Sequence, residues 1–378
     1  MKVLVNAITI TEGGGMVVLL QLLESMQQHD ATIAWYIVAE PNTLSCLPIS
    51  DKIIRVPYTW ARKSPLHLLY WYEFELPKLI TREKIDICFS ITNFLPRQKL
   101  SCPSLLLIHN AGFFSAAFIK SSLKDYFLWQ RKIKWVHHSI KRATAVTIQT
   151  QALSDKIARQ LNISPEKIFT IPHGPGFLKM GTQKMNHFPI ESCWRIGYVS
   201  KFGPQKDFAT AIKAVAALKE KGINIKLILT LNQTTREYPS IARQIHQYGI
   251  DDCVENLGEV TDPSTLQTIY ESLHLFIFPS LVESFGFTLV EAMGFGLPIV
   301  AAGTDGNREI TGMAGEFFQP SNADELAEKI LRLMTNKDLY LLASQKSKKR
   351  CQDFSWNIAG QAILNIMRQM LPNNGREV

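Results

Sequence analysis

Short apolar runs alternate with helical patterns along nearly the whole chain, and this alternation restricts the fold more than any other feature of the sequence. Helical patterns in the first half include residues 15–28, 66–81, 119–141 and 151–161. The apolar runs expected to form strands there lie near residues 2–7, 32–39, 52–56, 86–90, 103–108, 144–148 and 168–171. Strands that alternate with helices build βαβ units and a parallel, doubly wound sheet. The sequence therefore predicts an α/β fold.

A second series of the same kind follows a polar stretch rich in Pro and Gly, from about residue 172 to residue 192. Its expected strands lie near 194–199, 225–230, 253–257, 274–278, 297–301 and 315–318, and helical patterns at 322–335, 338–352 and 356–370 close the chain. A chain of 378 residues is long enough for two domains. We expect two Rossmann-like domains facing a cleft, at 1–175 and 193–355. A linker at 176–192 would join them, and a C-terminal helix and tail at 356–378 would cross back to the first domain.

The six cysteines are scattered and form no CxxC pair, which argues against a zinc site and against a disulfide framework. No apolar run approaches the ~20 residues that span a bilayer. No signal segment is evident after the first residues. We therefore expect a cytoplasmic protein, either soluble or attached to a membrane from one side.

The net charge of +8 is concentrated in the first half of the chain. Residues 1–190 carry 22 Lys and Arg against 12 Asp and Glu, a balance of +10, whereas residues 191–378 have a balance of −2. The first domain should face an anionic partner. The basic segment from Lys120 to Arg142 is interleaved with aromatic residues, including Phe118, Tyr126, Phe127, Trp129 and Trp135. This mixture favours the inner face of an anionic membrane over nucleic acid, which we do not expect as a partner. The alternative is a core-facing aromatic stripe with a solvated basic face.

Two glutamates eight residues apart, Glu283 and Glu291, form the strongest motif. An apolar strand pattern ends just before Glu283, and Glu291 lies about a turn into the next helix. Gly286 allows a close backbone approach near the helix start, where free N–H groups attract anions such as phosphate. Two carboxylates beside such a site can accept hydrogen bonds from sugar and ribose hydroxyls. The alternative is a capped surface helix with one solvated glutamate.

Two lysines, Lys201 and Lys206, lie in the loop after another expected strand. Ammonium groups there suit a diphosphate and can stabilise charge on a leaving group. The alternative is two solvated lysines. We expect both Lys206 and Glu283 to lie in exposed loops.

Two further features follow strands of the first half. Gly13-Gly14-Gly15 comes after the first strand and before an apolar helix, so its backbone could approach a phosphate, or it could simply make a tight turn. His109 ends a buried strand and could touch a reacting hydroxyl, or pack at a domain edge. His173 has a weaker case of the same kind. No DxD sequence occurs, so the sequence nominates no acidic pair for a metal ion.

Together these residues resemble the retaining glycosyltransferases of family 4, which have the GT-B fold, and the resemblance covers most of the chain. It includes Leu297-Pro298-Ile299-Val300 and Gly306-Asn307-Arg308-Glu309-Ile310. Lys201 departs from the usual Arg, and His173 from a frequent Asn.

The resemblance implies a metal-independent transfer of a hexose from a UDP- or GDP-sugar to a glycan or lipid-linked acceptor, with no cofactor. The first domain would bind the acceptor and the second the nucleotide sugar. It implies catalytic roles for His109, Lys201, Lys206 and Glu283. It implies donor-binding roles for Gly14, Gly15, Gly258, Val260, Ser284, Phe285, Gly286, Phe287 and Glu291. An epimerase or phosphorylase on the same architecture, or a non-catalytic nucleotide-sugar-binding protein, remain alternatives.

Overall fold

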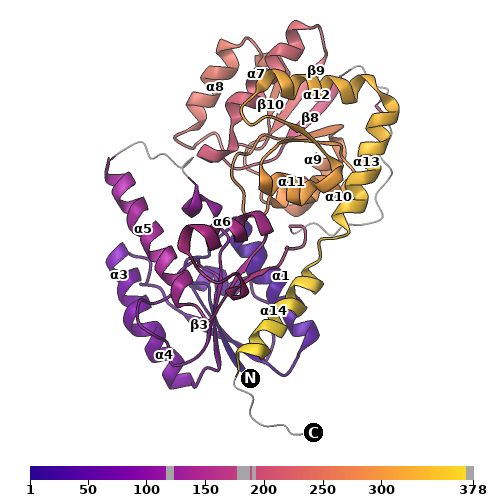
Figure 1. Ribbon diagram of the computed structural model, residues 1–378. Helices are drawn as coiled ribbons and strands as arrows, with labels where there is room; N and C mark the ends of the chain where they lie inside the picture. The colour runs from indigo at the N-terminus through magenta and orange to yellow at the C-terminus, as the bar shows by residue number, and fades with distance from the viewer. Residues whose placement is uncertain (116–122, 177–187, 190–192, 372–378) are drawn as a thin grey trace. The chain divides into compact units, whose positions relative to one another are not determined.

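The computed structural model describes residues 1–115, 123–176, 188–189 and 193–371 (Figure 1). The chain divides into two compact units. The first comprises the described residues of 1–174 and 355–371, and the second those of 175–354. Most of the expected linker at 176–192 lies outside the described residues.

The first unit is built on a seven-stranded parallel sheet in the order β3-β2-β1-β4-β5-β6-β7. The strand order reverses between β1 and β4. These two strands are neighbours in the sheet although β2 and β3 come between them in the sequence. Their bounds are β1 Lys2–Asn6, β2 Ala34–Ala39, β3 Ile53–Pro57, β4 Ile87–Ser90, β5 Ser104–Leu107, β6 Ala145–Ile148 and β7 Ile168–Thr170. The seven strands lie close to the predicted positions.

The helices of this unit are α1 Gly13–His29, α2 Pro41–Ser45, α3 Pro65–Tyr70, α4 Leu76–Glu83, α5 Leu123–Arg142, α6 Gln151–Leu161 and α14 Trp356–Met370. Two 3₁₀ turns lie at Ala111–Phe114 and Pro165–Lys167. A π-helical turn at Trp71–Glu75 interrupts the single helix predicted for 66–81. Pro77 explains the interruption, because it has no N–H to donate to the carbonyl of Glu73. That carbonyl accepts a hydrogen bond from Gln98 instead.

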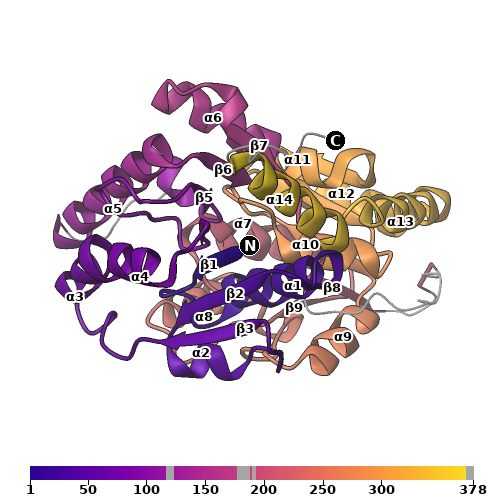
Figure 2. The same ribbon diagram turned by 90° about the horizontal axis from the view of Figure 1, so that it is seen from below.

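The last helix, α14, packs against α1 within the first unit, and Figure 2 shows the two lying side by side. Gly360 permits the close approach, because a Cβ there would collide with the side chain of Ser25. An ion pair of 2.8 Å between Arg368 and Asp30 lies at the far end of the contact. The segment from Ser355 on therefore belongs to the first unit although 180 residues separate it from Gly174.

The second unit has a six-stranded parallel sheet in the order β10-β9-β8-β11-β12-β13. The strands are β8 Trp194–Tyr198, β9 Ile225–Leu229, β10 Val254–Asn256, β11 Leu275–Phe278, β12 Ile299–Ala302 and β13 Gly315–Phe318. The helices are α7 Phe208–Glu220, α8 Tyr238–Gln247, α9 Pro263–Ser272, α10 Phe287–Gly294, α11 Asp305–Thr311, α12 Ala323–Thr335 and α13 Lys337–Cys351, with 3₁₀ turns at Pro204–Lys206, Asp251–Cys253 and Gly312–Ala314.

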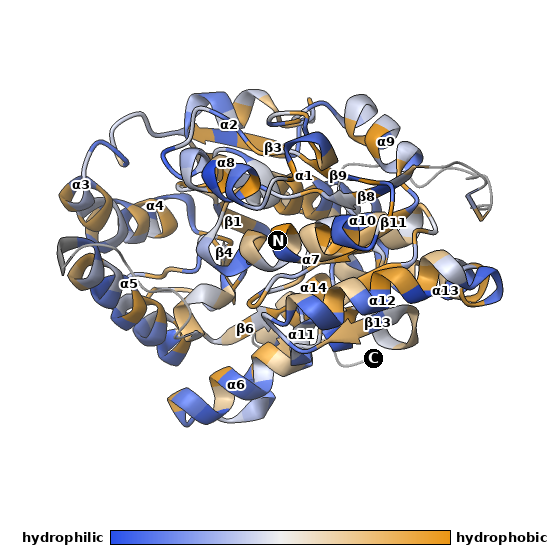
Figure 3. Ribbon diagram, turned by 90° about the horizontal axis from the view of Figure 1, so that it is seen from above, coloured by the Kyte–Doolittle hydropathy of each residue, from blue (hydrophilic) through white to orange (hydrophobic). Residues whose placement is uncertain are grey.

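The central strands of both sheets are largely apolar and buried, as parallel sheets covered by helices require. All four residues of β11 are 0% exposed. Figure 3 colours the residues by hydropathy. It shows hydrophilic residues along much of α5, with hydrophobic ones among them. The prediction of two doubly wound, parallel-sheet α/β domains is confirmed.

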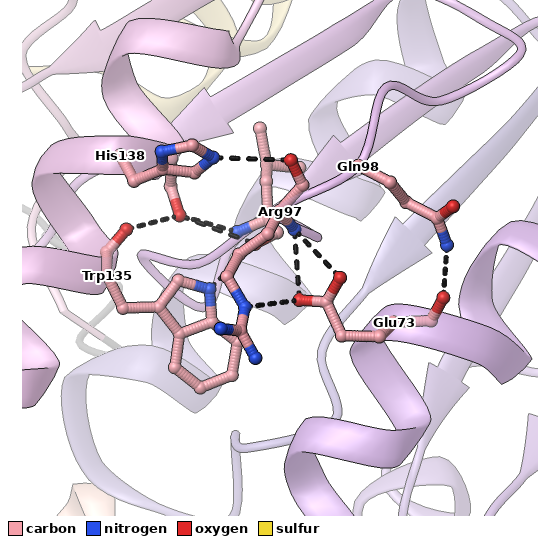
Figure 4. Close-up of polar contacts among 7 residues, drawn as sticks. Glu73, Arg97, Gln98, Trp135 and His138 are labelled. Carbon is pink, nitrogen blue, oxygen red and sulfur yellow. Dashed lines mark hydrogen bonds and ion pairs between the residues drawn. The ribbon is translucent and has the colours of Figure 1, made fainter.

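The segment that follows β4 ties α5 to the π-helical turn (Figure 4). The backbone N–H and the guanidinium of Arg97 both donate to Glu73, at 3.0 and 3.1 Å. The carbonyl of Arg97 lies 3.2 Å from Nε2 of His138 on α5. The indole of Trp135 donates to the carbonyl of Leu95 at 2.8 Å. These bonds connect the π-helical turn to α5 through the segment that contains Leu95 and Arg97.

Candidate functional site

Two loops meet at the carboxyl edge of the second sheet, where the strand order reverses between β8 and β11. In doubly wound sheets ligands bind at this switch point. The backbone N–H of Leu281, after β11, donates to the carbonyl of Gln205, after β8, at 2.8 Å. The hydroxyl of Tyr198, the last residue of β8, donates to the carbonyl of Lys206 at 2.5 Å and so fixes the loop after β8 to the end of that strand. The fold therefore brings together the two charged motifs of the second unit.

Lys206 and Glu283 form an ion pair of 2.5 Å across these loops. Glu283 also accepts a hydrogen bond of 2.5 Å from Ser280. The ammonium of Lys206 lies 5.5 Å from the ring centre of Phe278, within cation–π range. The side chains of Lys206 and Glu283 are only 17% and 14% exposed, so the expectation that they lie in exposed loops was wrong. The reason is that each loop covers the other.

Lys201 lies in the same loop but pairs with a different carboxylate. Its ammonium is 2.5 Å from Glu259, which follows β10. The other oxygen of Glu259 accepts from the amide of Asn232, after β9, at 2.9 Å. Gly258 and Val260, two of the predicted donor-binding residues, flank Glu259. Gly258 has a φ of +79°, a conformation suited to glycine, and Val260 packs against the core of the unit.

The first turn of α10 follows Glu283 directly. Gly286 precedes the helix with a φ of +83°, and a Cβ there would lie 3.2 Å from the ring of Phe278. Phe285 is buried and packs edge-on against Phe287 and Phe354, which fixes the backbone of the turn. Ser284 and the first N–H groups of α10 lie at this end of the helix, where the helix dipole favours an anion.

Glu291 lies inside α10 and is 4% exposed, so the alternative of a solvated surface glutamate is wrong. It accepts a hydrogen bond of 2.8 Å from the hydroxyl of Tyr270, and one from the backbone N–H of Gly176. Burial raises the pKa of Glu291 to about 7, although these two hydrogen bonds oppose the shift. The carboxyl group therefore changes its charge near neutral pH.

Asn307 supports the site, although its residue type and its place in the Gly306–Ile310 motif indicate no such role. Its side chain is buried and donates to the carbonyls of Ser280 and Ala302, both at 2.9 Å. It thereby joins the loop after β11 to the end of β12. An amide that follows a buried strand is the only signal in the sequence that could have indicated this bridge.

The carboxyl edge of the first sheet holds His109, after β5. Asn93, held at a φ of +69°, accepts from the backbone N–H of His109 at 2.9 Å, and its amide lies 3.1 Å from Nε2 of the ring. Burial lowers the pKa of His109 to about 4, so the imidazole is neutral at physiological pH. His173 stacks on Trp356, and burial followed by the charge of His109 lowers its pKa to about 3.

Gln149 follows β6 and was not nominated from the sequence. β5 and β6 are neighbours, with Leu107 opposite Thr147, so Gln149 follows β6 at the same carboxyl edge of the sheet at which His109 follows β5. Both polar atoms of its carboxamide are buried and have no hydrogen-bond partner among the residues that the structure describes.

The three glycines lie inside the first turn of α1 rather than before it. The helix was expected to begin at residue 15 and begins at Gly13, the one glycine of the three with a positive φ, +63°. Gly14 is exposed, and a Cβ at Gly15 would lie 2.9 Å from the side chain of Ile10. The exposed first turn has no acidic residue and no side-chain cap, so it presents backbone N–H groups at its end.

Within the described part of the chain, no three His, Cys, Asp or Glu side chains lie close enough together to hold a metal ion. None of the described helices is both long and apolar enough to cross a membrane.

Two family descriptions match the chain, one in each unit. "Glycosyltransferase Family 4" matches residues 12–174, and "Glycosyl transferases group 1" matches residues 183–350. The chain belongs to the group 1 glycosyltransferases. It has their GT-B fold of two Rossmann-like domains, as the resemblance implied.

Known glycosyltransferases similar to this one include two mannosyltransferases. The MMP alpha-(1->4)-mannosyltransferase of Mycolicibacterium hassiacum is 28% identical over 58% of this chain and 52% of its own length. The O-antigen chain mannosyltransferase B of Escherichia coli is 24% identical over 62% and 63%. The matches thus span about half to two thirds of these relatives. Among solved structures, Anabaena HepE in complex with UDP-glucose has a TM-score of 0.74 at 18% identity, covering 98% of this chain and all of that one.

Proposed function

We propose that this glycosyltransferase moves a hexose from a UDP- or GDP-sugar to a glycan or lipid-linked acceptor, with retention of the anomeric configuration and without a metal ion. The observation that carries the proposal is the Lys206–Glu283 pair, which lies at the switch point of the second sheet directly before the first turn of α10. A cation, a carboxylate and a helix N-terminus meet there, as a diphosphate bonded to a sugar requires.

The second unit would hold the nucleotide sugar. Lys206 and Lys201 would contact the diphosphate, and Glu283 with the backbone of 284–287 would bind the transferred sugar. Glu291 would accept from the ribose hydroxyls, and Gly258 and Val260 would contact the base. The two mannosyltransferases to which this chain is similar support a sugar donor of the hexose class.

The first unit would contribute His109 and the first turn of α1. A neutral imidazole can both donate and accept a hydrogen bond, and so suits a hydroxyl of the donor sugar or acceptor. Gly14 and Gly15 would let backbone N–H groups approach a phosphate.

Retention would follow from attack of the acceptor oxygen on the face of the anomeric carbon that the diphosphate leaves. The bond from that carbon to the diphosphate oxygen breaks, and the new glycosidic bond forms. The acceptor hydroxyl gives its proton to the departing diphosphate. Lys206 and the N–H groups of α10 would stabilise the leaving charge, which replaces the need for a metal ion.

The acceptor side would bind an anionic membrane through α3 and α5. Along α3 and the π-helical turn, Leu66, Tyr70 and Phe74 are all exposed and lie four residues apart, and Tyr126, Phe127 and Leu128 are exposed on α5. Six exposed basic residues lie on or beside these elements: Arg62 and Lys63 just before α3, Lys78 on α4, and Arg131, Lys132 and Lys134 on α5. Figures 1 and 2 both show α3 and α5 on the same side of the first unit. We call these twelve residues the aromatic–basic face. Apolar anchors among basic side chains suit the surface of an anionic bilayer.

Part of the segment predicted to bind the membrane does not belong to this face. Trp135 packs edge-on against Tyr72 and donates its N–H to Leu95, so it is turned towards the rest of the unit and is only partly exposed, and Trp129 stacks on Phe113. Phe118 and Lys120 lie outside the described residues.

The function is tested by incubating the protein with UDP-glucose, GDP-mannose and other hexoses linked to UDP or GDP. Each donor is combined with a panel of octyl glycosides as acceptors. Release of the nucleoside diphosphate together with a disaccharide product supports transfer. Conversion of the nucleotide sugar without an acceptor would support an epimerase. Formation of sugar phosphate with inorganic phosphate would support a phosphorylase, and binding without turnover a non-catalytic protein.

A further inference from the structure

Glu259 pairs with one of the two lysines proposed to bind the diphosphate. Its carboxylate accepts from Lys201 at 2.5 Å and from Asn232 at 2.9 Å, so both of its oxygens are used. The three residues follow β8, β9 and β10, which are neighbours at one edge of the sheet. The contact with Lys201, then that with Asn232, lowers the pKa of Glu259, so the carboxylate is charged at neutral pH.

The two lysines of the site therefore both face a carboxylate, but in different surroundings. Lys206 and Glu283 are 17% and 14% exposed, whereas Lys201 and Glu259 are 52% and 27% exposed. An ion pair that is open to water contributes little to stability, so it is broken easily. A diphosphate carries more charge than one carboxylate, and can replace Glu259 as the partner of Lys201 at a small cost.

We propose that Glu259 is a positioning residue that holds Lys201 when no nucleotide is bound and competes with the diphosphate for it. This inference rests on the proposed function, since it presumes that Lys201 contacts the diphosphate. Glu259 orients the lysine at the site and at the same time weakens binding of the nucleoside diphosphate. It thereby favours release of the product after transfer.

The test is calorimetric titration of the full chain with UDP and GDP for the natural protein, Glu259→Gln, Lys201→Met and the double variant. Glu259→Gln should tighten binding of whichever nucleotide binds by about three- to fivefold, the upper part of what an exposed ion pair contributes. Lys201→Met should weaken it. In the Lys201→Met background, Glu259→Gln should change the affinity by less than a factor of two, because the competition acts through Lys201.

Glu255→Gln is the matched control. Glu255 pairs with Arg195 at 3.1 Å in the same unit but does not contact Lys201. If Glu255→Gln tightened nucleotide binding as much as Glu259→Gln, the cause would be a general effect of net charge, and the proposal would be overturned. Glu259→Asp, which keeps the charge, should stay closer to the natural affinity than Glu259→Gln does.

Other results separate this proposal from the proposed function. Weaker binding of both nucleotides to Glu259→Gln would mean that Glu259 contacts the ligand directly, and weaker binding of GDP alone would indicate contact with the base. Either result, or an unchanged affinity, overturns the competition and leaves the proposed function standing. A natural protein that binds neither UDP nor GDP at millimolar concentration would overturn both.

Discussion

The hydroxyl of Tyr270 donates a hydrogen bond of 2.8 Å to Glu291 and holds this carboxyl group where almost no water reaches it. Burial raises the pKa of Glu291 from 4.5 to about 7 in the folded protein. Between these two values the folded state binds a proton that the unfolded state has released. Stability therefore falls as the pH rises through this window, by about 3 kcal/mol in total.

Glu291→Gln should remove this dependence. We expect the variant to melt at a higher temperature than the natural protein at pH 8 and at a similar temperature at pH 4.5, in paired scans by calorimetry. Its affinity for the nucleotide should fall, because the amide replaces a carboxylate that accepts from ribose. An equal difference in melting temperature at both pH values would contradict the assigned shift.

Lys206→Ala and Glu283→Ala should each lower kcat by ~10²–10³, as loss of one charge contact to a leaving group does. Each should also lower stability by about 1–3 kcal/mol, because the partner is mostly buried and is left without its counter-charge. The double variant Lys206→Met/Glu283→Gln should recover much of the stability and none of the activity. Near-normal turnover of either single variant would remove both residues from the site.

Transfer should continue in excess EDTA. Lys206, Lys201 and the first turn of α10 would neutralise the charge of the diphosphate, so no metal ion is needed. The measurement is product formation before and after chelation, with Mg²⁺ and Mn²⁺ added back. Activity that is lost and then restored by either ion would show that the diphosphate chemistry has been misplaced.

Gln149→Met should raise the stability of the protein. The carboxamide of Gln149 is buried with no hydrogen-bond partner among the described residues, and such a group costs about 1–3 kcal/mol that an apolar side chain of similar length avoids. Gln151→Met serves as the control, because the side chain of Gln151 bonds to Asp155 and Thr170. Denaturant unfolding should place the two variants on opposite sides of the natural protein. Destabilisation by Gln149→Met would mean that the amide is satisfied.

Binding to anionic vesicles should depend on the aromatic–basic face. The triple variant Leu66→Ser/Tyr70→Ser/Phe74→Ser should sediment less with phosphatidylglycerol vesicles, because it loses three exposed apolar anchors. Salt should weaken binding of the natural protein, and neutral vesicles should not retain it. Ile358→Ser is the control, since Ile358 is exposed on α14, away from this face. Absence of binding at low salt would leave a soluble acceptor.

The strands and most helices could be predicted because their signals are local. β11 is a continuous apolar run with a turn after it, and such a run can only be a buried strand or a short core helix. Pro77 is a local signal for a break in this helix, but the form of the break could not be predicted, since the carbonyl of Glu73 finds its partner in Gln98, which is distant in the sequence. The helical pattern continues across it unchanged.

Of the site, the sequence could predict which charged residues take part, but not how they contact one another. The position of Lys206 and Glu283 at strand ends was evident, but their contact depends on β8 and β11 being neighbours, and they are 77 residues apart. Burial is equally non-local, which is why the exposure of both residues was misjudged. Glu259, Asn307 and Gln149 were missed because their importance lies in which side chains surround them, and residue type alone carries no such signal.

The return of α14 to α1 has a consequence for the order in which the protein is made. As the chain leaves the ribosome, the residues of the second unit emerge as one uninterrupted segment, whereas the first unit waits for its last helix. Until α14 arrives, the surface of α1 around Ser25, against which Gly360 packs in the finished protein, has no cover. The half of the molecule synthesised first would thus be completed last, and a nascent chain stalled before Trp356 would expose apolar surface that invites chaperones or aggregation.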